Sequence, residues 1–153
     1  MRNNVIVAGA RTPIARGRKG GLVSVDAWEL ARVVVPEVIS RSGVDANDVD
    51  DIVLAENMQG GGVIARHTAV SLGLTGVPGM AVNRHCAAGQ VAVQTAVGQI
   101  RSGVAEVVIA GGTESMSTMP FGGKMGADGT TTQWMPPSHP NTPEAPAFDM
   151  AMT

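Results

Sequence analysis

Short apolar runs alternate along this chain with longer stretches in which apolar residues recur every three or four positions. The short runs, at residues 5–8, 51–56, 80–82 and 106–110, predict four β-strands, of which the first is expected to be buried. The longer stretches lie between Asp26 and Gly43, at 64–72 and at 87–102, and predict helices. Strands that alternate with helices predict an α/β fold, with a largely parallel sheet covered by helices and right-handed crossovers.

Local signals mark the ends of two of these helices. Asp26 and Glu29 have the spacing of a capping box, in which each side chain binds the backbone amide of the other residue. Gly43 and Gly103 follow the first and last helical stretches and are predicted to end them. The helix at 87–102 is apolar on most of its circumference, which predicts that another domain or subunit covers it.

Composition narrows the class of protein further. The 153 residues include 20 Gly, no Tyr, two Trp and two Phe, so the core must consist of small side chains packed at close range, as in a layered α/β protein. A net charge of −2 without a long basic run argues against nucleic-acid binding, and no apolar run is long enough to cross a membrane. One cysteine excludes an intramolecular disulfide, and with no leader pattern it predicts a cytoplasmic protein.

The pattern of alternating elements stops near Ser115. Beyond it the chain is rich in methionine and glycine, and five prolines fall between Pro136 and Pro146. We expect no sustained secondary structure in residues 115–153, which are more typical of an inserted lobe than of a compact domain.

Cys86, the only cysteine, is the strongest functional candidate. It lies between the strand at 80–82 and the helix at 87–102, where helix amides and the helix dipole stabilise a thiolate. Arg84 and His85 precede it, and no Asp or Glu occurs between Glu56 and Glu106. These surroundings favour a nucleophilic thiolate, and the alternative is a small buried side chain without a chemical role.

The three histidines are weaker candidates. His67 lies in a predicted helix, and His139 lies in the irregular final part of the chain. His85 should point away from Cys86 if the two occupy successive positions of an extended segment. We therefore predict none of the three as the general base.

Gly60-Gly61-Gly62 stands between a predicted strand and a predicted helix, as in a loose dinucleotide-binding loop. The acidic residue expected about 20 positions later is absent, because that stretch contains no Asp or Glu. We therefore expect a tight turn with close backbone packing and no bound cofactor. Paired cysteines and an H-E-x-x-H pair are also missing from the sequence, so no metal site is predicted.

Four segments in order along the chain together resemble the thiolase family, with the acetyl-CoA acetyltransferase and 3-ketoacyl-CoA thiolase branches as its nearest members. The segments are Arg11-Thr12-Pro13-Ile14, Met58-Gln59-Gly60-Gly61-Gly62 with Arg66, Asn83-Arg84-His85-Cys86-Ala87-Ala88-Gly89, and Ala110-Gly111-Gly112-Thr113-Glu114-Ser115-Met116-Ser117-Thr118-Met119-Pro120. The resemblance implies that residues 1–114 are a thiolase N-terminal domain that lacks its last strand. Its mixed, mostly parallel sheet would be covered by helices, and residues 115–153 would begin an inserted loop domain.

The same resemblance implies an acyltransferase of fatty acid metabolism. Cys86 would be the nucleophile that carries the acyl group as a thioester, and its backbone amide would be an oxyanion donor. Acyl-CoA and CoA would be the substrates, without a cofactor or metal, in a homo-oligomer that is a dimer or tetramer. The strand at 80–83 would pair with its copy in another subunit. Two alternatives are a catalytically inactive thiolase-fold subunit that dimerises or holds a ligand, and a ketoacyl synthase-like condensing enzyme.

Two departures from the family pattern bear on activity. Ala88 stands where the family usually has serine, so a hydroxyl near Cys86 is missing. The chain is also less than half the family length and lacks the G-H-P, N-E-A-F and C-x-G-G-G motifs of the second half. Ser138-His139-Pro140 falls in the predicted loop domain and does not replace the G-H-P motif. We therefore predict that these 153 residues alone are inactive.

Overall fold

The computed structural model describes residues 3–57, 59–118 and 123–133. The chain divides into two compact units, Met1–Met119 and Pro120–Thr153. The sequence prediction placed this boundary after residue 114, and the assignment of the two units to thiolase domains stays a prediction.

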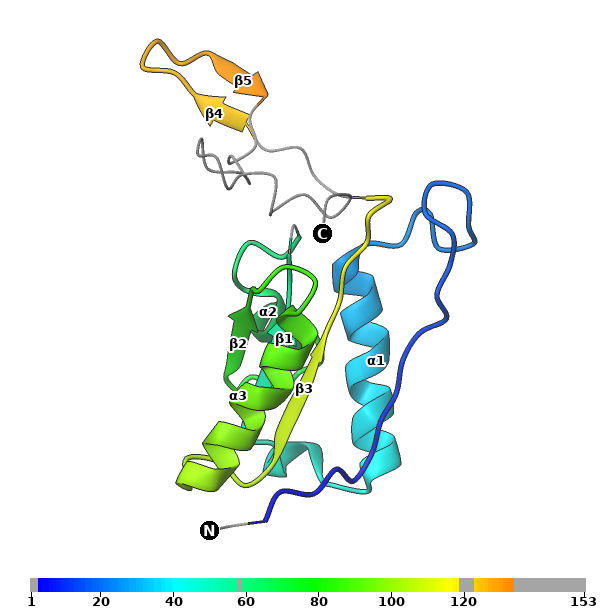
Figure 1. Ribbon diagram of the computed structural model, residues 1–153, viewed down its shortest axis with the longest axis vertical. Coiled ribbons are helices and arrows are strands. Elements are labelled where there is room, and N and C mark those ends of the chain that lie inside the picture. The colour runs from blue at the N-terminus through cyan, green and yellow to red at the C-terminus, as the bar shows by residue number, and fades with distance from the viewer. Residues whose placement is uncertain (1–2, 58, 119–122, 134–153) are drawn as a thin grey trace, which may run out of the picture. The chain divides into compact units, whose positions relative to one another are not determined.

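The larger unit is built on a three-stranded parallel sheet with the order β2-β1-β3 (Figure 1). Its strands are β1 Asp51–Ala55, β2 Gly79–Val82 and β3 Val108–Gly112, and Ile52 of β1 lies opposite both Gly79 and Ile109. Its helices are α1 Ala27–Ser42, α2 Ile64–Ser71 and α3 Ala88–Ser102, and the short 3₁₀ helix η1 Ala46–Asp48 precedes β1. The predicted α/β alternation and parallel sheet are confirmed.

The three helices cover both faces of this sheet. Ile52 and Leu54 of β1 belong to one apolar cluster with buried residues of α1 and α2. On the opposite face, Gln99 of α3 donates a hydrogen bond of 2.6 Å to the Asp51 carboxylate. Every residue of β1 is buried, as expected for a central parallel strand with helices on both sides.

The predicted helix signals are confirmed. The Asp26 carboxylate accepts a hydrogen bond from the Glu29 amide at 2.7 Å, and the Glu29 carboxylate accepts one from the Asp26 amide at 3.1 Å. Gly43 and Gly103 follow α1 and α3 with φ of 69° and 79°, a left-handed conformation that glycine adopts at little cost.

Small side chains let the layers approach closely. A Cβ atom on Gly79 would collide with the backbone of Ala65 and Arg66, so β2 and α2 touch through glycine. The buried residues of α3 are Ala88, Ala92 and Ala96. Other apolar side chains of α3 are only partly covered, and Val93 is 44% exposed. The described residues thus leave much of the apolar surface of α3 open. That another domain or subunit covers this surface stays a prediction.

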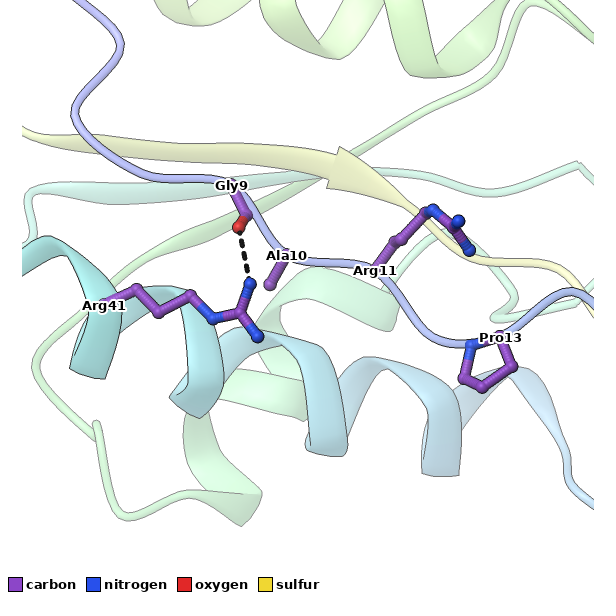
Figure 2. A pocket seen from close by; sticks show the side chains of 5 residues that line it. All are labelled: Gly9, Ala10, Arg11, Pro13 and Arg41. Carbon is purple, nitrogen blue, oxygen red and sulfur yellow. Dashed lines mark hydrogen bonds between the residues drawn. The ribbon is translucent and has the colours of Figure 1, made fainter.

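The predicted buried strand at residues 5–8 is wrong. Residues 3–16 form no helix or strand, and Val5, Ile6 and Val7 are 76%, 89% and 66% exposed. The segment is instead held by hydrogen bonds on either side of this run. Asn4 Nδ2 donates to the Val97 carbonyl of α3 at 3.4 Å, and Arg41 Nη1 of α1 donates to the Gly9 carbonyl at 3.2 Å (Figure 2).

A cavity of about 710 Å³ lies between this run and the sheet. Residues 4–12 line one side of the cavity and residues 107–114 line another, while apolar side chains of α1 and α3 form its remaining walls. Among the residues that the structure describes, none pairs with the outer edge of β3. β-Branched residues favour a strand only where a neighbouring backbone completes the hydrogen bonds, and here the cavity separates the two segments.

The smaller unit contains an antiparallel hairpin of β4 Gly123–Met125 and β5 Thr131–Gln133. The sequence analysis missed this hairpin, although Asp128-Gly129 is a common hairpin turn sequence. Gly129 has φ of 79°, and the Asp128 carboxylate accepts hydrogen bonds from the Thr130 hydroxyl and amide. These two bonds, the hydroxyl first, hold the pKa of Asp128 below its ordinary value.

Candidate active site

The loops that follow the three parallel strands leave from the same edge of the sheet (Figure 1). They comprise residues 56–63 after β1, 83–87 after β2 and 113–118 after β3. In parallel α/β sheets the carboxyl ends of the strands are where ligands usually bind. The loop at residues 83–87 contains Cys86 and is called the Cys86 turn below.

Cys86 lies in an exposed turn that leads directly into α3. The helix begins at Ala88 with Ala87 as its N-cap, so the prediction that a helix starts within one turn of Cys86 is confirmed. The Ala87 amide donates to the Arg84 carbonyl at 3.1 Å, and the Ala88 amide donates to the His85 carbonyl at 3.0 Å. Within the described residues no backbone amide is bonded to the Cys86 sulfur, so the expected stabilisation by such contacts is not observed.

The backbone of His85 differs from the extended segment that the sequence suggested. Its φ is 48°, a left-handed conformation that is uncommon for a residue other than glycine. The Asn83 side chain supports this turn, because its Oδ1 accepts a hydrogen bond from the His85 amide at 2.9 Å. His85 therefore precedes Cys86 in a tight turn.

The other candidate bases do not meet Cys86 in the described structure. His67, on α2, packs its ring edge-on against Trp28, with ring centres 4.2 Å apart. His139 lies outside the described residues. That none of the three histidines is the general base stays a prediction.

Two arginines of the acid-free stretch between Glu56 and Glu106 contribute to packing away from Cys86. Arg66 donates hydrogen bonds to the carbonyls of Val77 and Thr75, in the connection before β2. Arg101 lies at the far end of α3, about 20 Å of helix from Cys86, and donates to Asn4 Oδ1. Proximity in sequence therefore overstated the positive charge near the thiol.

The glycine loop after β1 is a tight turn, as predicted. Gly60, Gly61 and Gly62 all have positive φ, at 98°, 59° and 85°. The buried Glu56 carboxylate accepts hydrogen bonds from the amides of Gly62 and Ile64, at the start of α2. A phosphate at a helix start would need those same amides, so Glu56 occupies the place of a bound anion.

The loop after β3 is fastened to the start of α1. Thr113 Oγ1 donates to the Ala27 carbonyl at 2.9 Å, and Ser115 Oγ donates to the Val25 carbonyl at 2.7 Å. Gln59 contributes from the glycine loop, because its Oε1 accepts from the Ala27 amide at 3.1 Å. Thr113 and Ser115 therefore have a structural role in the loop after β3.

Sequence reasoning missed a connection between the three loops. Asn57 follows β1, Asn83 follows β2 and Glu114 follows β3. Glu114 Oε2 accepts a hydrogen bond from the Asn57 amide at 2.9 Å, and Asn83 Nδ2 donates to the Asn57 carbonyl at 3.0 Å. The available signal was a polar residue shortly after each strand, since parallel strands bring such residues to one edge. Glu114 also shows that the acid-free stretch in the sequence is not an acid-free region in space.

The described residues contain no group of three or more His, Cys, Asp or Glu side chains placed to hold a metal ion. No helix among them has the length and apolar character of a membrane span.

Comparison with known proteins places this arrangement in a family. Residues 4–135 match the family model described as thiolase, N-terminal domain. The acetyl-CoA acetyltransferase of Pseudomonas aeruginosa is 37% identical over 124 residues, which cover 79% of this chain and 31% of that protein. The beta-ketoadipyl-CoA thiolase of Pseudomonas knackmussii is 45% identical over 117 residues, which cover 72% of this chain and 29% of that protein.

A solved structure agrees with these sequence matches. The crystal structure of the Bacillus anthracis acetyl-CoA acetyltransferase superposes with a TM-score of 0.75 at 36% identity, covering 86% of this chain and 34% of that one. The chain thus spans about a third of the length of the relatives it matches. Because the family model covers most of its residues, the chain belongs to the thiolase family and corresponds to the N-terminal domain.

Proposed function

We propose that this chain carries the nucleophile of a thiolase-type acyl-CoA acyltransferase. In this proposal Cys86 forms an acyl-thioester during thiolytic cleavage of 3-ketoacyl-CoA or condensation of acetyl-CoA. The single supporting observation is the exposed Cys86 on a turn at the start of α3, at the carboxyl edge of a parallel sheet. The names of the relatives, acetyl-CoA acetyltransferase and thiolase, support the same class of reaction.

The chemistry consists of two acyl transfers. The Cys86 thiolate attacks the carbonyl carbon of the acyl group, and a carbon–sulfur bond forms while the bond to the leaving group breaks. The leaving group is the CoA thiolate when acetyl-CoA is the donor, and the acetyl-CoA carbanion when a 3-ketoacyl-CoA is cleaved; either takes up a proton. A second CoA thiolate or an acetyl-CoA carbanion then accepts the acyl group and regenerates the Cys86 thiolate.

The turn supplies part of what this chemistry needs. The backbone amide of Cys86 is the proposed donor to the oxyanion that forms during attack. The proposed substrates are acyl-CoA and CoA, and the proposal involves no cofactor or metal ion. The proposed setting is a cytoplasmic homo-oligomer that acts in fatty acid metabolism. The feature that supports the homo-oligomer is β2, which lies at one edge of the described sheet.

Transfer of an acetyl group to Cys86 tests the proposal directly. The 153-residue chain is incubated with acetyl-CoA and analysed by intact mass spectrometry, followed by peptide mapping. We expect one acetyl group on Cys86, which hydroxylamine removes because it is a thioester. The Cys86→Ala variant is the control and should take up none.

A negative result would favour the rival function. If Cys86 takes no acetyl group, and iodoacetamide modifies it no faster than N-acetylcysteine, the nucleophile assignment is wrong. The chain would then fit a catalytically inactive thiolase-fold subunit that dimerises or holds a ligand.

A further inference from the structure

A continuous set of hydrogen bonds connects the end of β3 to the residue before Cys86. It begins at Glu114, whose Oε2 accepts from the Asn57 amide at 2.9 Å. The Asn57 carbonyl accepts from Asn83 Nδ2 at 3.0 Å, and Asn83 Oδ1 accepts from the His85 amide at 2.9 Å. The loops after all three strands are therefore joined at the Cys86 turn.

The turn needs such support because of its backbone. His85 has φ of 48°, and a residue with a Cβ atom keeps this conformation only where its surroundings impose it. Residues 83–87 are all exposed, so burial does not hold them in place. The Asn83 side chain is the described contact that binds both the turn and the neighbouring loop.

We propose that Glu114 and Asn83 are positioning residues that hold the left-handed turn at His85 and so aim Cys86. Glu114 fixes the backbone of Asn57, and Asn57 presents its carbonyl to Asn83. Neither side chain has to touch the substrate for this role. The inference rests on the proposed function of Cys86, because its consequence is the reactivity of that thiol.

Because Cys86 is the only cysteine of the chain, the rate of thiol modification reports on this residue alone. The rate of iodoacetamide modification is measured from about pH 6 to about pH 9 for the 153-residue chain, a range that brackets the ordinary titration of a free thiol. We expect Glu114→Ala and Asn83→Ala each to lower the rate at neutral pH by about threefold to tenfold, the equivalent of one hydrogen bond.

Conservative and combined variants separate positioning from general damage. Glu114→Gln keeps an oxygen acceptor for the Asn57 amide and should retain the rate within about twofold. The double variant Glu114→Ala with Asn83→Ala should lose little more than either single variant, because both act through one path. Glu37→Ala removes an equal charge from an exposed ion pair on α1 and should react like the wild type.

Hydrogen exchange at the His85 amide tests the inference without relying on thiol chemistry. Glu114→Ala should speed this exchange by about threefold to tenfold, through the path from Asn57 to Asn83. The inference is overturned if Glu114→Ala leaves both the His85 exchange rate and the rate of Cys86 modification at their wild-type values. If Glu114→Ala fails to fold, Asn83→Ala and Glu114→Gln decide by the same two measurements. Absence of acetyl transfer to wild-type Cys86, with His85 exchange still dependent on Glu114, would refute the proposed function alone.

Discussion

Asp50 and Val107 exchange hydrogen bonds immediately before the two neighbouring strands β1 and β3. The Asp50 amide donates to the Val107 carbonyl at 2.9 Å, and the Val107 amide donates to Asp50 Oδ2 at 3.0 Å. The same carboxylate oxygen accepts from the Glu106 amide at 2.6 Å. The Val107 amide first, and then the Glu106 amide, hold the pKa of Asp50 below its ordinary value.

This relationship predicts how stability depends on pH. A carboxyl group whose pKa is lowered in the folded state contributes stability that is complete above its unfolded pKa of about 3.9. The contribution is lost as the pH falls through the lower folded value. As the pH falls below about 4, we expect the free energy of unfolding to decrease more steeply for the wild type than for Asp50→Asn. Urea unfolding across this range measures the difference.

The effect should be modest because Asp50 is exposed to solvent. Asp48→Asn is the matched control, since Asp48 is also exposed and precedes the same strand. An equal change in pH dependence in both variants would contradict the assignment to the Asp50 hydrogen bonds.

Adjacent glycines in the loop after β1 should respond differently to alanine. A Cβ atom on Gly60 would collide with the Glu56 carboxylate and with Ile64, whereas one on Gly61 would meet open space. Both positions have positive φ, so Gly61→Ala should cost about 1 kcal/mol from backbone strain alone. Gly60→Ala should lower the free energy of unfolding by about 1–3 kcal/mol more. Equal losses in urea unfolding would show that Glu56 does not hold the loop.

Turnover requires a nucleophile, oxyanion donors and general acid–base groups, and the 153-residue chain is not expected to supply all of them. Removing one oxyanion donor typically costs about 100- to 1,000-fold in rate, and loss of general acid–base catalysis about 100- to 10,000-fold. We therefore expect no measurable CoA-dependent cleavage of acetoacetyl-CoA by the 153-residue chain, even if Cys86 is acetylated. Mass-verified protein is required, and turnover comparable to that of a full-length thiolase would show that the catalytic groups have been misplaced.

The outer edge of β2 should mediate association between two copies of the chain. β2 lies at an edge of the described sheet, and Met80 on it is 41% exposed. We expect a dimer at micromolar concentration in sedimentation velocity, and Met80→Lys should weaken it because a charged side chain opposes pairing of sheet edges. Val104→Lys, at an exposed site outside the strands, is the control. A monomeric wild type would refute this prediction.

Local features of the fold could be predicted because their causes lie within a few residues. The capping box at Asp26 and Glu29 needs only side chains three positions apart, and Gly43 needs only its own backbone freedom. The absence of a strand at residues 5–8 could not be predicted in this way, because strand formation also depends on a neighbouring strand elsewhere in the chain. The exposed Val5 to Val7 run shows that β-branched composition is not sufficient.

In the candidate site, too, the features set by neighbouring residues could be predicted and the contacts between distant residues could not. The position of Cys86 before a helix followed from the local pattern, since a short apolar run leads into a long helical stretch. The link from Glu114 to Asn83 passes through the backbone of Asn57, and the sequence does not state which carbonyl or amide a side chain will reach. Contacts of this kind depend on strand order, which the sequence alone left open.

The first residues of the chain form a strap around the cavity beside β3. The strap is fastened through Asn4 and Gly9, while the residues between these anchors contribute no sheet hydrogen bonds. Three side-chain hydrogen bonds hold these anchors, from Asn4 to Val97, from Arg101 to Asn4 and from Arg41 to Gly9, and none of them belongs to the pairing of β1 with β2 and β3. We therefore expect residues 4–9 to open at a lower free energy than the sheet, which would expose the apolar side chains of α1 and α3 that line the cavity.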